Sequence, residues 1–561
     1  MDDLQRAISI LRTYSEFTNI RSEDDTTVSF LYMDRRFHLY PVLENETEYP
    51  VICVEGDDSF GIPHIMPTST KDGFRYVCLR QGEYINFLSS FEEKIRDVCG
   101  RLISLMTLSD SEKEEEFHRE FVFYWNAACK SSSALEIYIG DKDGEFGSMN
   151  AYSRQSDGRS YGERLVKSGV RLNDREKDSE TSIPWMHHSE IAAVYIPLVS
   201  INGLMPPTKD APWTQSTLNR IIVEQHEIFL SPETYEKISN TKAKGDALFV
   251  TLGIPVGSKR ECCSFIIHNR RNTKVTILDW LRKRTAIELI MSIRSDYSYL
   301  CKVIGNDISI NKNFLVVGAG SLGSYVCKEL VKAGVRHLSV YDEDKLDIEN
   351  SFRWDCRLRN PLGSFFGYYK VDILKKDLEL IHPEIIIDAY HEKLTAEELG
   401  RICTQFDILI FTVGSSDFQY LANRELKETG YKGWAVYVWL EPGGNYSHIL
   451  SVNYAFPGCY QCLFTDTDGK LSENRYNLEH ADNGAELIMT NACGGTRAAY
   501  GNAVLLRTSA ALLGQLKGLL SGHRQENSLV DITPSEIVNH GSAFRNKLCK
   551  CCGDSDGITT D

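Results

Sequence analysis

The sequence has no long apolar run. No stretch approaches the ~20 consecutive apolar residues that a helix needs to span a bilayer, so we expect no membrane-spanning segment and no membrane partner. Residues 1–17, MDDLQRAISILRTYSEF, also lack the basic stretch and apolar core of a secretory signal, and they have the pattern of an amphipathic helix instead. These two absences predict a cytoplasmic protein.

An excess of positive charge is absent as well. The 62 Lys and Arg residues are outnumbered by 78 Asp and Glu residues, which gives a formal net charge of −16. Such a balance argues against a nucleic-acid partner held mainly by phosphate contacts. We also find no internal repeat and no low-complexity segment, and a chain of this length suggests about three domains.

A disulfide framework is the third feature that the sequence lacks. The 16 cysteines are scattered through a long chain without secretory features. Reduced thiols, metal ligands and catalytic thiols are therefore better interpretations of these residues than disulfides.

What the sequence does contain is a phosphate-binding pattern. Residues 314–317 and 337–341 predict two buried parallel strands, and GAGSLG lies between them at the start of a predicted helix. Glycine permits the tight turn and the close approach of a phosphate, and the helix N-terminus offers unpaired N–H groups. The candidate nucleotide-binding residues in this turn are Gly318, Gly320, Ser321 and Gly323.

Charged and polar residues follow the second predicted strand. Asp342 lies where a carboxylate accepts ribose hydroxyls, and Asp344, Asn350, Arg353 and Lys370 come after it. A dehydrogenase has the same glycine pattern, but hydride transfer has no need of an arginine and a lysine here. Cleavage of a triphosphate at its α-phosphorus does need them, because charge develops on the phosphoryl oxygens.

The pattern D-x-D-x(5)-N-x-x-R, followed by G-x-x-K, resembles the ATP-adenylating domain of the ubiquitin-activating and ThiF/MoeB superfamily. The resemblance implies that residues 306–561 form an α/β, Rossmann-like domain that binds ATP and Mg²⁺. It also implies that the domain adenylates the C-terminal glycine of a ubiquitin-like protein. In this interpretation Asp342 holds the ribose, Asn350 faces the phosphates, and Arg353 and Lys370 are catalytic.

The magnesium ligand departs from the pattern of the family. The family usually places a Mg²⁺-binding aspartate directly after the strand predicted at residues 407–412, but Val413 and Gly414 stand there. Asp417 follows a few residues later. Either Asp417 or Asp344 takes the role, and the sequence leaves both open.

Two cysteine pairs far apart in the chain predict a zinc site. Cys459 and Cys462 form one C-x-x-C pair, and Cys549 and Cys552 form another. Four thiolates suit a closed tetrahedral zinc site with a structural role. Cys551 is an alternative to Cys552, although the C-x-x-C spacing favours Cys552.

A further cysteine lies between these pairs. Cys493 stands in NACGGT before a helix predicted at residues 498–520, and a helix N-terminus lowers the pKa of a thiol. Activating enzymes that form a thioester carry a cysteine on a segment that crosses over the adenylate. The resemblance therefore makes Cys493 the candidate for the first thioester.

Residues 1–130 resemble a ubiquitin-conjugating domain of the α+β class. The passage 60–83, FGIPHIMPTSTKDGFRYVCLRQGE, has the order of that fold, with Pro63-His64 in place of its His-Pro-Asn region. Cys78 falls where the family keeps its thioester cysteine, although a buried structural thiol is the alternative. No asparagine follows His64, so the group that stabilises the oxyanion is not evident.

Residues 131–305 have no independent resemblance. Strands are predicted at residues 194–199, 247–256 and 263–268, with the last two paired, and a helix is predicted at residues 280–299. We interpret this region as an α+β linker domain between the two catalytic ends of the chain.

The domain order resembles the fused activating and conjugating enzymes of bacterial CBASS antiphage islands. These enzymes act on the C-terminus of a cGAS-like nucleotidyltransferase, and the family implies a homodimer. The expected reaction is adenylation of a C-terminal glycine, transfer to Cys493 and then to Cys78, and conjugation to a target lysine. Two alternatives are a sulfur-carrier-protein adenylyltransferase with an inactive N-terminal domain, and a non-enzymatic scaffold with a degenerate nucleotide site.

Overall fold

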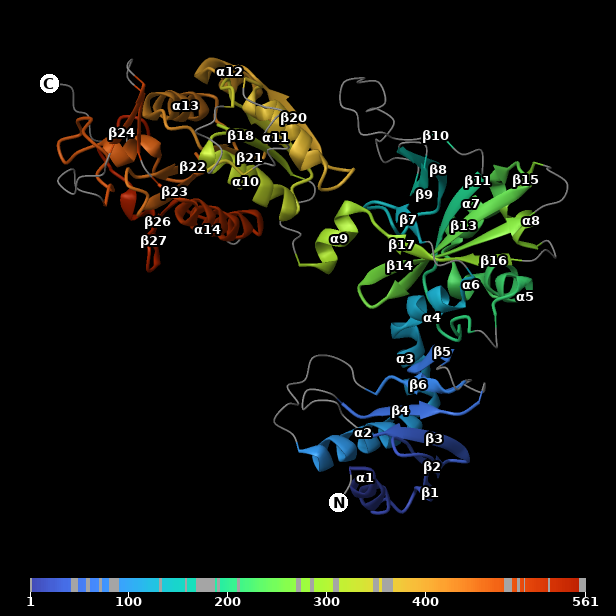
Figure 1. Ribbon diagram of the computed structural model, residues 1–561. Coiled ribbons are helices and arrows are strands. Elements are labelled where there is room, and N and C mark those ends of the chain that lie inside the picture. The colour runs from blue at the N-terminus through green and yellow to red at the C-terminus, as the bar shows by residue number, and fades with distance from the viewer. Residues whose placement is uncertain are drawn as a thin grey trace. The chain divides into compact units, whose positions relative to one another are not determined.

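The computed structural model shows a chain of two compact units, residues 1–295 and 296–561, which are described separately below (Figure 1). The described residues are 3–41, 49–56, 61–69, 73–79, 90–130, 134–156, 159–167, 187–188, 192–208, 212–268, 274–282, 287–305, 312–346, 353–355, 367–478, 487–491, 495–498, 500–522 and 525–553.

The first unit begins with an antiparallel sheet against which helices pack. Its strands follow the order β1-β2-β3-β4-β6-β5, and α1 and α2 share one apolar core with them. Each of α2 and α3 starts at a serine whose side chain and backbone form a capping box, which explains why both helices begin where they do. The elements are α1 (Asp3–Leu11), β1 (Thr18–Ser22), β2 (Val28–Tyr32), β3 (Arg35–Tyr40), β4 (Val51–Val54), β5 (Ile65–Ser69), β6 (Arg75–Val77), α2 (Phe91–Met106), α3 (Asp110–Arg119) and α4 (Phe121–Ala128).

The rest of the first unit is built on a mixed sheet. Its strand order is β16-β14-β13-β11-β8-β9-β7-β17, with β10 paired to β8, and α4 packs into its core through Phe121 and Trp125. The strands are β7 (Leu135–Tyr138), β8 (Gly147–Ser156), β9 (Arg159–Lys167), β10 (His187–His188), β11 (Ala192–Pro197), β13 (Ala247–Val256), β14 (Lys259–His268), β16 (Ile287–Ile290) and β17 (Ser292–Arg294). The helices are α5 (Gln215–Asn219), α6 (His226–Phe229), α7 (Pro232–Asn240) and α8 (Ile277–Arg282), and β12 (Lys242–Ala243) pairs with β15 (Val275–Thr276).

The second unit contains a Rossmann-like sheet. Five parallel strands lie in the order β20-β19-β18-β21-β22, and β23, β26 and β27 extend the sheet antiparallel. In chain order this is 3-2-1-4-5, the arrangement of doubly wound nucleotide-binding folds. The strands are β18 (Asn313–Val317), β19 (His337–Tyr341), β20 (Ile386–Tyr390), β21 (Ile408–Phe411), β22 (Trp434–Leu440), β23 (Ser447–Val452), β26 (Ser528–Ile532) and β27 (Ile537–Gly541). A separate pair is formed by β24 (Leu487–Asn491) and β25 (Gly495–Ala498).

The core of the second unit lies on both faces of its sheet, because successive side chains of β18 point to opposite faces. Phe314 and Val316 face one cluster, and Leu315 and Val317 face the other. The helices of the first cluster are α9 (Tyr297–Val303), α10 (Ser321–Lys332), α11 (Lys370–Glu379) and α14 (Asn502–Leu520). Those of the second are α12 (Ala396–Ile402) and α13 (Ser416–Glu428). Helices therefore cover both faces of the parallel strands, as a buried parallel sheet requires.

Two sequence-based predictions of elements are corrected by the structure. The helix predicted at residues 280–299 is replaced by the end of α8, strands β16 and β17, and the start of α9. The apolar residues of 287–290 pair with β14, so tertiary pairing overrides the helical pattern. The helix predicted from residue 498 begins at Asn502, because residues 495–498 pair with β24.

Helix α14 is the one helix among the described residues that is long and apolar enough to cross a membrane. Half of it is buried within the second unit. Leu505, Leu512 and Leu516 are fully or almost fully buried in the core that α14 shares with α10. We interpret α14 as a core helix for this reason.

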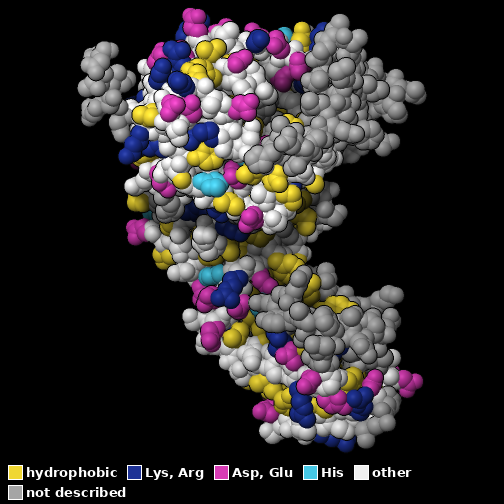
Figure 2. Space-filling view, turned by 90° about the vertical axis from the view of Figure 1, so that its left-hand side faces the viewer, with side chains coloured by type: hydrophobic (Ala, Val, Ile, Leu, Met, Phe, Trp, Pro, Cys, Tyr) yellow, Lys and Arg dark blue, Asp and Glu magenta, His cyan; other side chains and the backbone are white. Residues whose placement is uncertain are grey.

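Charges of both signs are mixed on the described surface. On the face in Figure 2, side chains of Asp and Glu are intermixed with those of Lys and Arg, and hydrophobic side chains lie between them. The excess of negative charge is therefore not gathered into one patch on this face.

Candidate functional site

A pocket of about 910 Å³ opens at the carboxyl ends of β18, β21 and β22. This is the switch point of the strand order, where doubly wound folds bind their ligands. Among the predicted site residues, those that line it are Gly320, Ser321, Asp344, Arg353 and Lys370. The lining also includes Trp439, Glu441, Tyr460, Phe464, Ser472, Glu473, Asn474, Asn477 and Tyr500.

The glycine turn has the geometry that the sequence predicted. Gly318 adopts φ +102°, a conformation that favours glycine, and its N–H donates to the carbonyl of Tyr341 at 2.8 Å. A Cβ on Gly323 would lie 2.0 Å from the Gly318 oxygen, so only glycine lets α10 start this close to the turn. Gly320 has open space beside it and lines the pocket, which leaves room for a ligand.

Asp342 fastens this turn to the end of β19. Its carboxylate accepts from the N–H of Ala319 at 2.6 Å and from the N–H of Asp344 at 2.8 Å. Burial raises the pKa of Asp342, while Lys370 and the backbone donors oppose that shift. Each carboxylate oxygen has a second lone pair, so these bonds are compatible with the predicted bond to ribose.

Lys370 is held at the first turn of α11. Its ammonium group lies 2.7 Å from the Asp344 carboxylate, and its backbone N–H donates to the Asp344 carbonyl at 3.0 Å. Lys370 is 7% exposed whereas the Asp344 side chain is 66% exposed. A buried cation next to an accessible carboxylate can exchange that partner for a phosphate oxygen without moving far.

Arg353 reaches the pocket from the segment after β19. Its guanidinium group lies 5.5 Å from the ring centre of Tyr500, and its Nε is buried without a hydrogen-bond partner among the described residues. The next residue, Trp354, donates from its indole to the Ala319 carbonyl at 2.8 Å. This bond ties the arginine to the glycine turn, so the two predicted phosphate-binding elements are held together.

Of the two candidates for a magnesium ligand, Asp344 lines the pocket. Asp417 is exposed in the first turn of α13 and is not among the residues that line it. The place of the usual aspartate is taken by Val413 and Gly414, whose turn is held by a bond from Gln419 Nε2 to the Val413 carbonyl at 2.8 Å.

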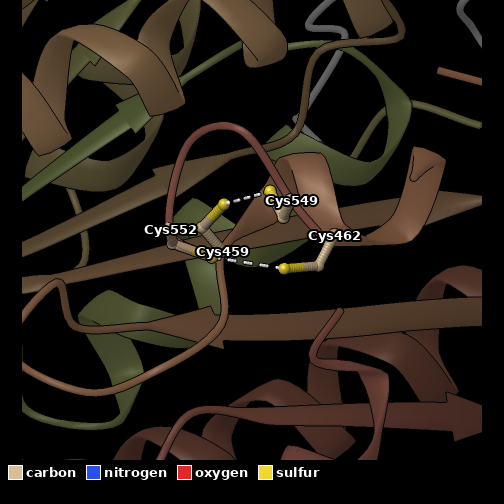
Figure 3. Close-up of side chains that lie close together, drawn as sticks. All are labelled: Cys459, Cys462, Cys549 and Cys552. Atoms are coloured by element: carbon tan, nitrogen blue, oxygen red, sulfur yellow. Dashed lines mark hydrogen bonds between the residues drawn. The ribbon is translucent and has the colours of Figure 1, made fainter. Parts of the chain in front are cut away.

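The four predicted metal ligands lie close together beside the pocket, and Figure 3 shows their side chains pointing toward one another. The sulfurs of Cys459, Cys462, Cys549 and Cys552 all lie within 4.8 Å of one another. Cys459 is 3.8 Å from Cys549, and Cys462 is 3.3 Å from Cys552, too far for disulfide bonds. Hydrogen bonds from Cys459 and the other thiols lower the pKa of Cys549.

Cys551 lies beside this cluster rather than in it. Its sulfur accepts from the amide of buried Asn423 at 3.4 Å. The carbonyl oxygen of the same amide accepts from the Tyr460 N–H at 3.1 Å. Asn423 therefore connects the C-terminal cysteine segment to the turn between Cys459 and Cys462.

That turn is also a wall of the pocket. Tyr460 lies between the two cysteines, and Phe464 ends the same short helical turn; both line the cavity. No sequence pattern signals this double use, because a C-x-x-C pair specifies its sulfurs and not the residues between them.

Cys78 is exposed in the first unit, just after β6. Its N–H donates to the carbonyl of His64 at 2.7 Å, which joins it to the Pro63-His64 loop. The imidazole of His64 is buried between Glu116 and Glu120, 3.1 Å from each. Burial lowers the pKa of His64, but the two carboxylates outweigh this and raise it.

The backbone at His64 is itself unusual. His64 adopts φ +64°, which is rare for a residue other than glycine, and its N–H donates to the Tyr124 hydroxyl at 2.8 Å. Sequence reasoning missed Glu116, Glu120 and Tyr124, which lie in helical segments far along the chain. Two further predicted site residues, Asn350 and Cys493, lie outside the described residues, and their roles stay predictions.

Comparison with known proteins identifies the domain around the pocket. The sequence model of the ThiF family matches residues 308–529. This segment holds the Rossmann-like sheet, the glycine turn and one of the two cysteine pairs. The second unit therefore contains a segment that matches the ThiF family.

Several characterised proteins resemble this part of the chain. The adenylyltransferase and sulfurtransferase MOCS3 of Culex quinquefasciatus is 27% identical over 255 residues, 44% of this chain and 51% of that protein. The ubiquitin-like modifier-activating enzyme ATG7 of Komagataella pastoris is 29% identical over 185 residues, 28% of this chain and 27% of that enzyme. The chain thus spans about half the length of MOCS3 and less of ATG7.

A solved structure with a similar segment is MccB of E. coli with ATP. It is 17% identical, covers 45% of this chain and 69% of its own, and has a TM-score of 0.33. The assignment of the domain rests on the sequence match and on the strand order, not on this likeness.

Proposed function

We propose that this protein uses ATP to activate the C-terminal glycine of a protein and conjugates it to a target amine through two cysteine thioesters. The observation that carries the proposal is the pocket in the ThiF-family domain, where Lys370, Arg353 and the glycine turn converge. The acyl donor is proposed to be a cGAS-like nucleotidyltransferase or a ubiquitin-like protein, in bacterial antiphage defence. A cytoplasmic homodimer is part of the same proposal.

The first step is adenylation at the pocket. A carboxylate oxygen of the terminal glycine attacks the α-phosphorus of ATP, the bond to the β-phosphate breaks, and pyrophosphate leaves. Arg353 and Lys370 stabilise the charge that develops on the phosphoryl oxygens, and the N–H groups at the start of α10 bind phosphate oxygens. Asp342 orients the ribose. Asp344 is the residue at the pocket that would hold Mg²⁺, which neutralises the triphosphate when bound.

Two acyl transfers follow. The thiolate of Cys493 attacks the acyl carbonyl and AMP leaves; the thiolate of Cys78 then attacks the thioester and Cys493 leaves as a thiolate. Finally a lysine amine of the target attacks, and Cys78 leaves. Support for Cys78 comes from its exposure and from its bond to the His64 loop. The order of α1, a four-strand antiparallel meander and later helices also supports a conjugating-like domain.

The cysteine cluster is proposed to hold a structural zinc ion. With Zn–S bonds of about 2.3 Å, the sulfurs of a tetrahedral site lie about 3.8 Å apart. Two sulfur pairs lie 3.8 Å and 3.3 Å apart, and all four sulfurs lie within 4.8 Å of one another, so the residues fit the ion. Four protein ligands leave no open position, and the ion would therefore join the two C-x-x-C segments rather than take part in the reaction.

Two single-cysteine variants test the relay. Cys493→Ala should still form adenylate but no thioester, and Cys78→Ala should still charge Cys493 and stop before conjugation. Reducing thiols cleave a thioester but not an amide, so paired reducing and non-reducing gels separate the stages. Cys403→Ala, which removes a buried thiol of the second unit that lies outside the pocket, is the control.

The same experiment distinguishes the proposed function from its principal alternative. A sulfur-carrier-protein adenylyltransferase, which is the name of a relative from Thermus thermophilus, needs no conjugating cysteine. The relay is refuted if Cys78→Ala conjugates at the wild-type rate. It is also refuted if the wild type forms no conjugate while its pyrophosphate exchange persists. Absence of ATP–pyrophosphate exchange in the wild type would instead favour a scaffold with a degenerate site.

A further inference from the structure

One wall of the pocket is a segment that is fastened at both ends. Residues 472–478, named the strap below, contribute Ser472, Glu473, Asn474 and Asn477 to the lining. The strap lies between the cysteine turn and the segment that leads toward Cys493 in the sequence. It contains no helix or strand, so its position depends on bonds to its surroundings.

The first end of the strap is anchored on the cysteine turn. The N–H of Ser472 donates to the Phe464 carbonyl at 2.7 Å, and the N–H of Arg475 donates to the Leu463 carbonyl at 3.0 Å. The guanidinium group of Arg475 also donates to the Cys462 carbonyl at 2.9 Å.

The second end is anchored by Glu441. The N–H of Leu478 donates to Glu441 Oε1 at 2.7 Å. Glu441 follows β22, is 3% exposed and lines the pocket. The same oxygen lies 2.6 Å from Nε2 of His448, which is fully buried in β23.

Glu441 belongs to a row of charges that crosses the sheet. The other ring nitrogen of His448 lies 2.7 Å from Asp531 of β26, and Asp531 in turn lies 2.7 Å from His540 of β27. The ring of Trp439 stacks on His448 at 4.8 Å and covers it on the side of β22. Among the described residues, the charged groups that face His448 are thus the carboxylates of Glu441 and Asp531, and His540 lies on the far side of Asp531.

Both ring nitrogens of His448 face a carboxylate. A neutral imidazole has only one N–H, so one of these contacts would set two lone pairs against each other; the imidazolium ion satisfies both. Burial lowers the pKa of His448, but the bonds to Asp531 and Glu441 outweigh it and raise that pKa. Removing one partner from a buried charge network is costly, so the ionised arrangement is strongly preferred.

We infer that Glu441 is a positioning residue, which His448 and Asp531 hold in place so that the strap stays fixed as a wall of the nucleotide pocket. The inference rests on the proposed function, because a fixed strap in the same pocket as Lys370 and Arg353 would help to orient the nucleotide that is proposed to bind there. The strap is then part of a preformed site and does not act as a lid.

Hydrogen exchange of the full-length protein without ligand tests this inference, and its readout needs no activity. Glu441→Gln keeps an acceptor for Leu478 but removes the charge that faces His448. We expect protection of the strap amides to fall about tenfold, as for the loss of one charge-assisted hydrogen bond. The matched control is His540→Gln, which alters the outer end of the row and should leave the strap protected.

The pH dependence of strap protection shows whether the charges of Glu441, His448 and Asp531 hold the strap or whether packing alone does. Because the folded pKa of His448 is raised, its contribution is complete at low pH and is lost as the pH rises through that pKa. Strap protection in the wild type, corrected for the intrinsic exchange rate, should therefore fall with rising pH, and Glu441→Gln should be low throughout. Unchanged protection in Glu441→Gln overturns the inference, and so does a wild-type profile that is flat from pH 6 to pH 10.

Discussion

At the scale of single residues, the nucleotide pocket depends on a few side chains with very different surroundings. Lys370 is buried and paired with Asp344, whereas Arg353 lies over Tyr500 with a buried Nε that lacks a partner among the described residues. A lysine ammonium group can change its partner by rotating its flexible side chain. An arginine presents a planar set of donors, which must be oriented toward the phosphate before it binds. The two cations are thus suited to different phosphate contacts.

Replacing Lys370 with alanine should reduce ATP–pyrophosphate exchange by about 10²–10³-fold, the usual effect of losing one charged transition-state contact. The fold should persist, because the partner carboxylate of Asp344 is 66% exposed and becomes hydrated. Lys332→Ala on α10 is the control, since Lys332 pairs with Glu329 on the surface and does not line the pocket. Wild-type exchange in a folded Lys370→Ala protein would contradict the assignment.

At the scale of elements, the sequence predicted those parts of the site that depend on local chemistry. The strands around the glycine turn, the turn itself and the convergence of the four cysteines agree with the structure, because short apolar runs, glycine and C-x-x-C spacing specify local geometry. Exposed Cys78 beside the His64 loop also agrees with its predicted setting.

Long-range contacts could not be predicted in the same way. Glu441, His448 and Asp531 carry no motif, and only the register of β22, β23 and β26 brings them together. The pairing of β16 with β14 likewise overrode a helical pattern. Such contacts depend on the whole sheet, which a single sequence does not reveal.

The cysteine cluster allows a prediction with an internal control. Cys459→Ser should lower the zinc content of the purified protein, measured by elemental analysis, and destabilise the segment around Cys549 and Cys552. Cys551→Ser should keep its metal, because Cys551 bonds to Asn423 and lies outside the group of four. Freshly purified wild-type protein without metal, or loss of metal in both variants, would contradict the ligand set.

At the scale of the whole molecule, the chain divides into two compact units with separate apolar cores. The ThiF-family match lies within the second unit, and the described residues that line the proposed nucleotide pocket all belong to that unit. The first unit carries Cys78 and its buried His64. A chain of this kind need not unfold in one step.

Calorimetry of the full chain should therefore show two transitions that respond to different changes. Cys459→Ser should lower only the transition of the second unit. His64→Gln should lower only that of the first, and most at low pH, because the raised pKa of His64 gives its ion pairs their full effect there and they weaken as the pH rises through it. If either variant shifts both transitions equally, the units are not independent.

The short turn from Cys459 to Phe464 limits how the sequence can vary. Two separate requirements set its length. Cys459 and Cys462 must both reach the cysteine cluster, and the rings of Tyr460 and Phe464 must both reach the pocket. An inserted or deleted residue would damage both arrangements at once, so no second change could rescue the turn by repairing only one of them. Gln461, between Tyr460 and Cys462, lines a different hollow, shared with Lys470 and Lys550, and it is 4% exposed, so this position is constrained from its other side as well.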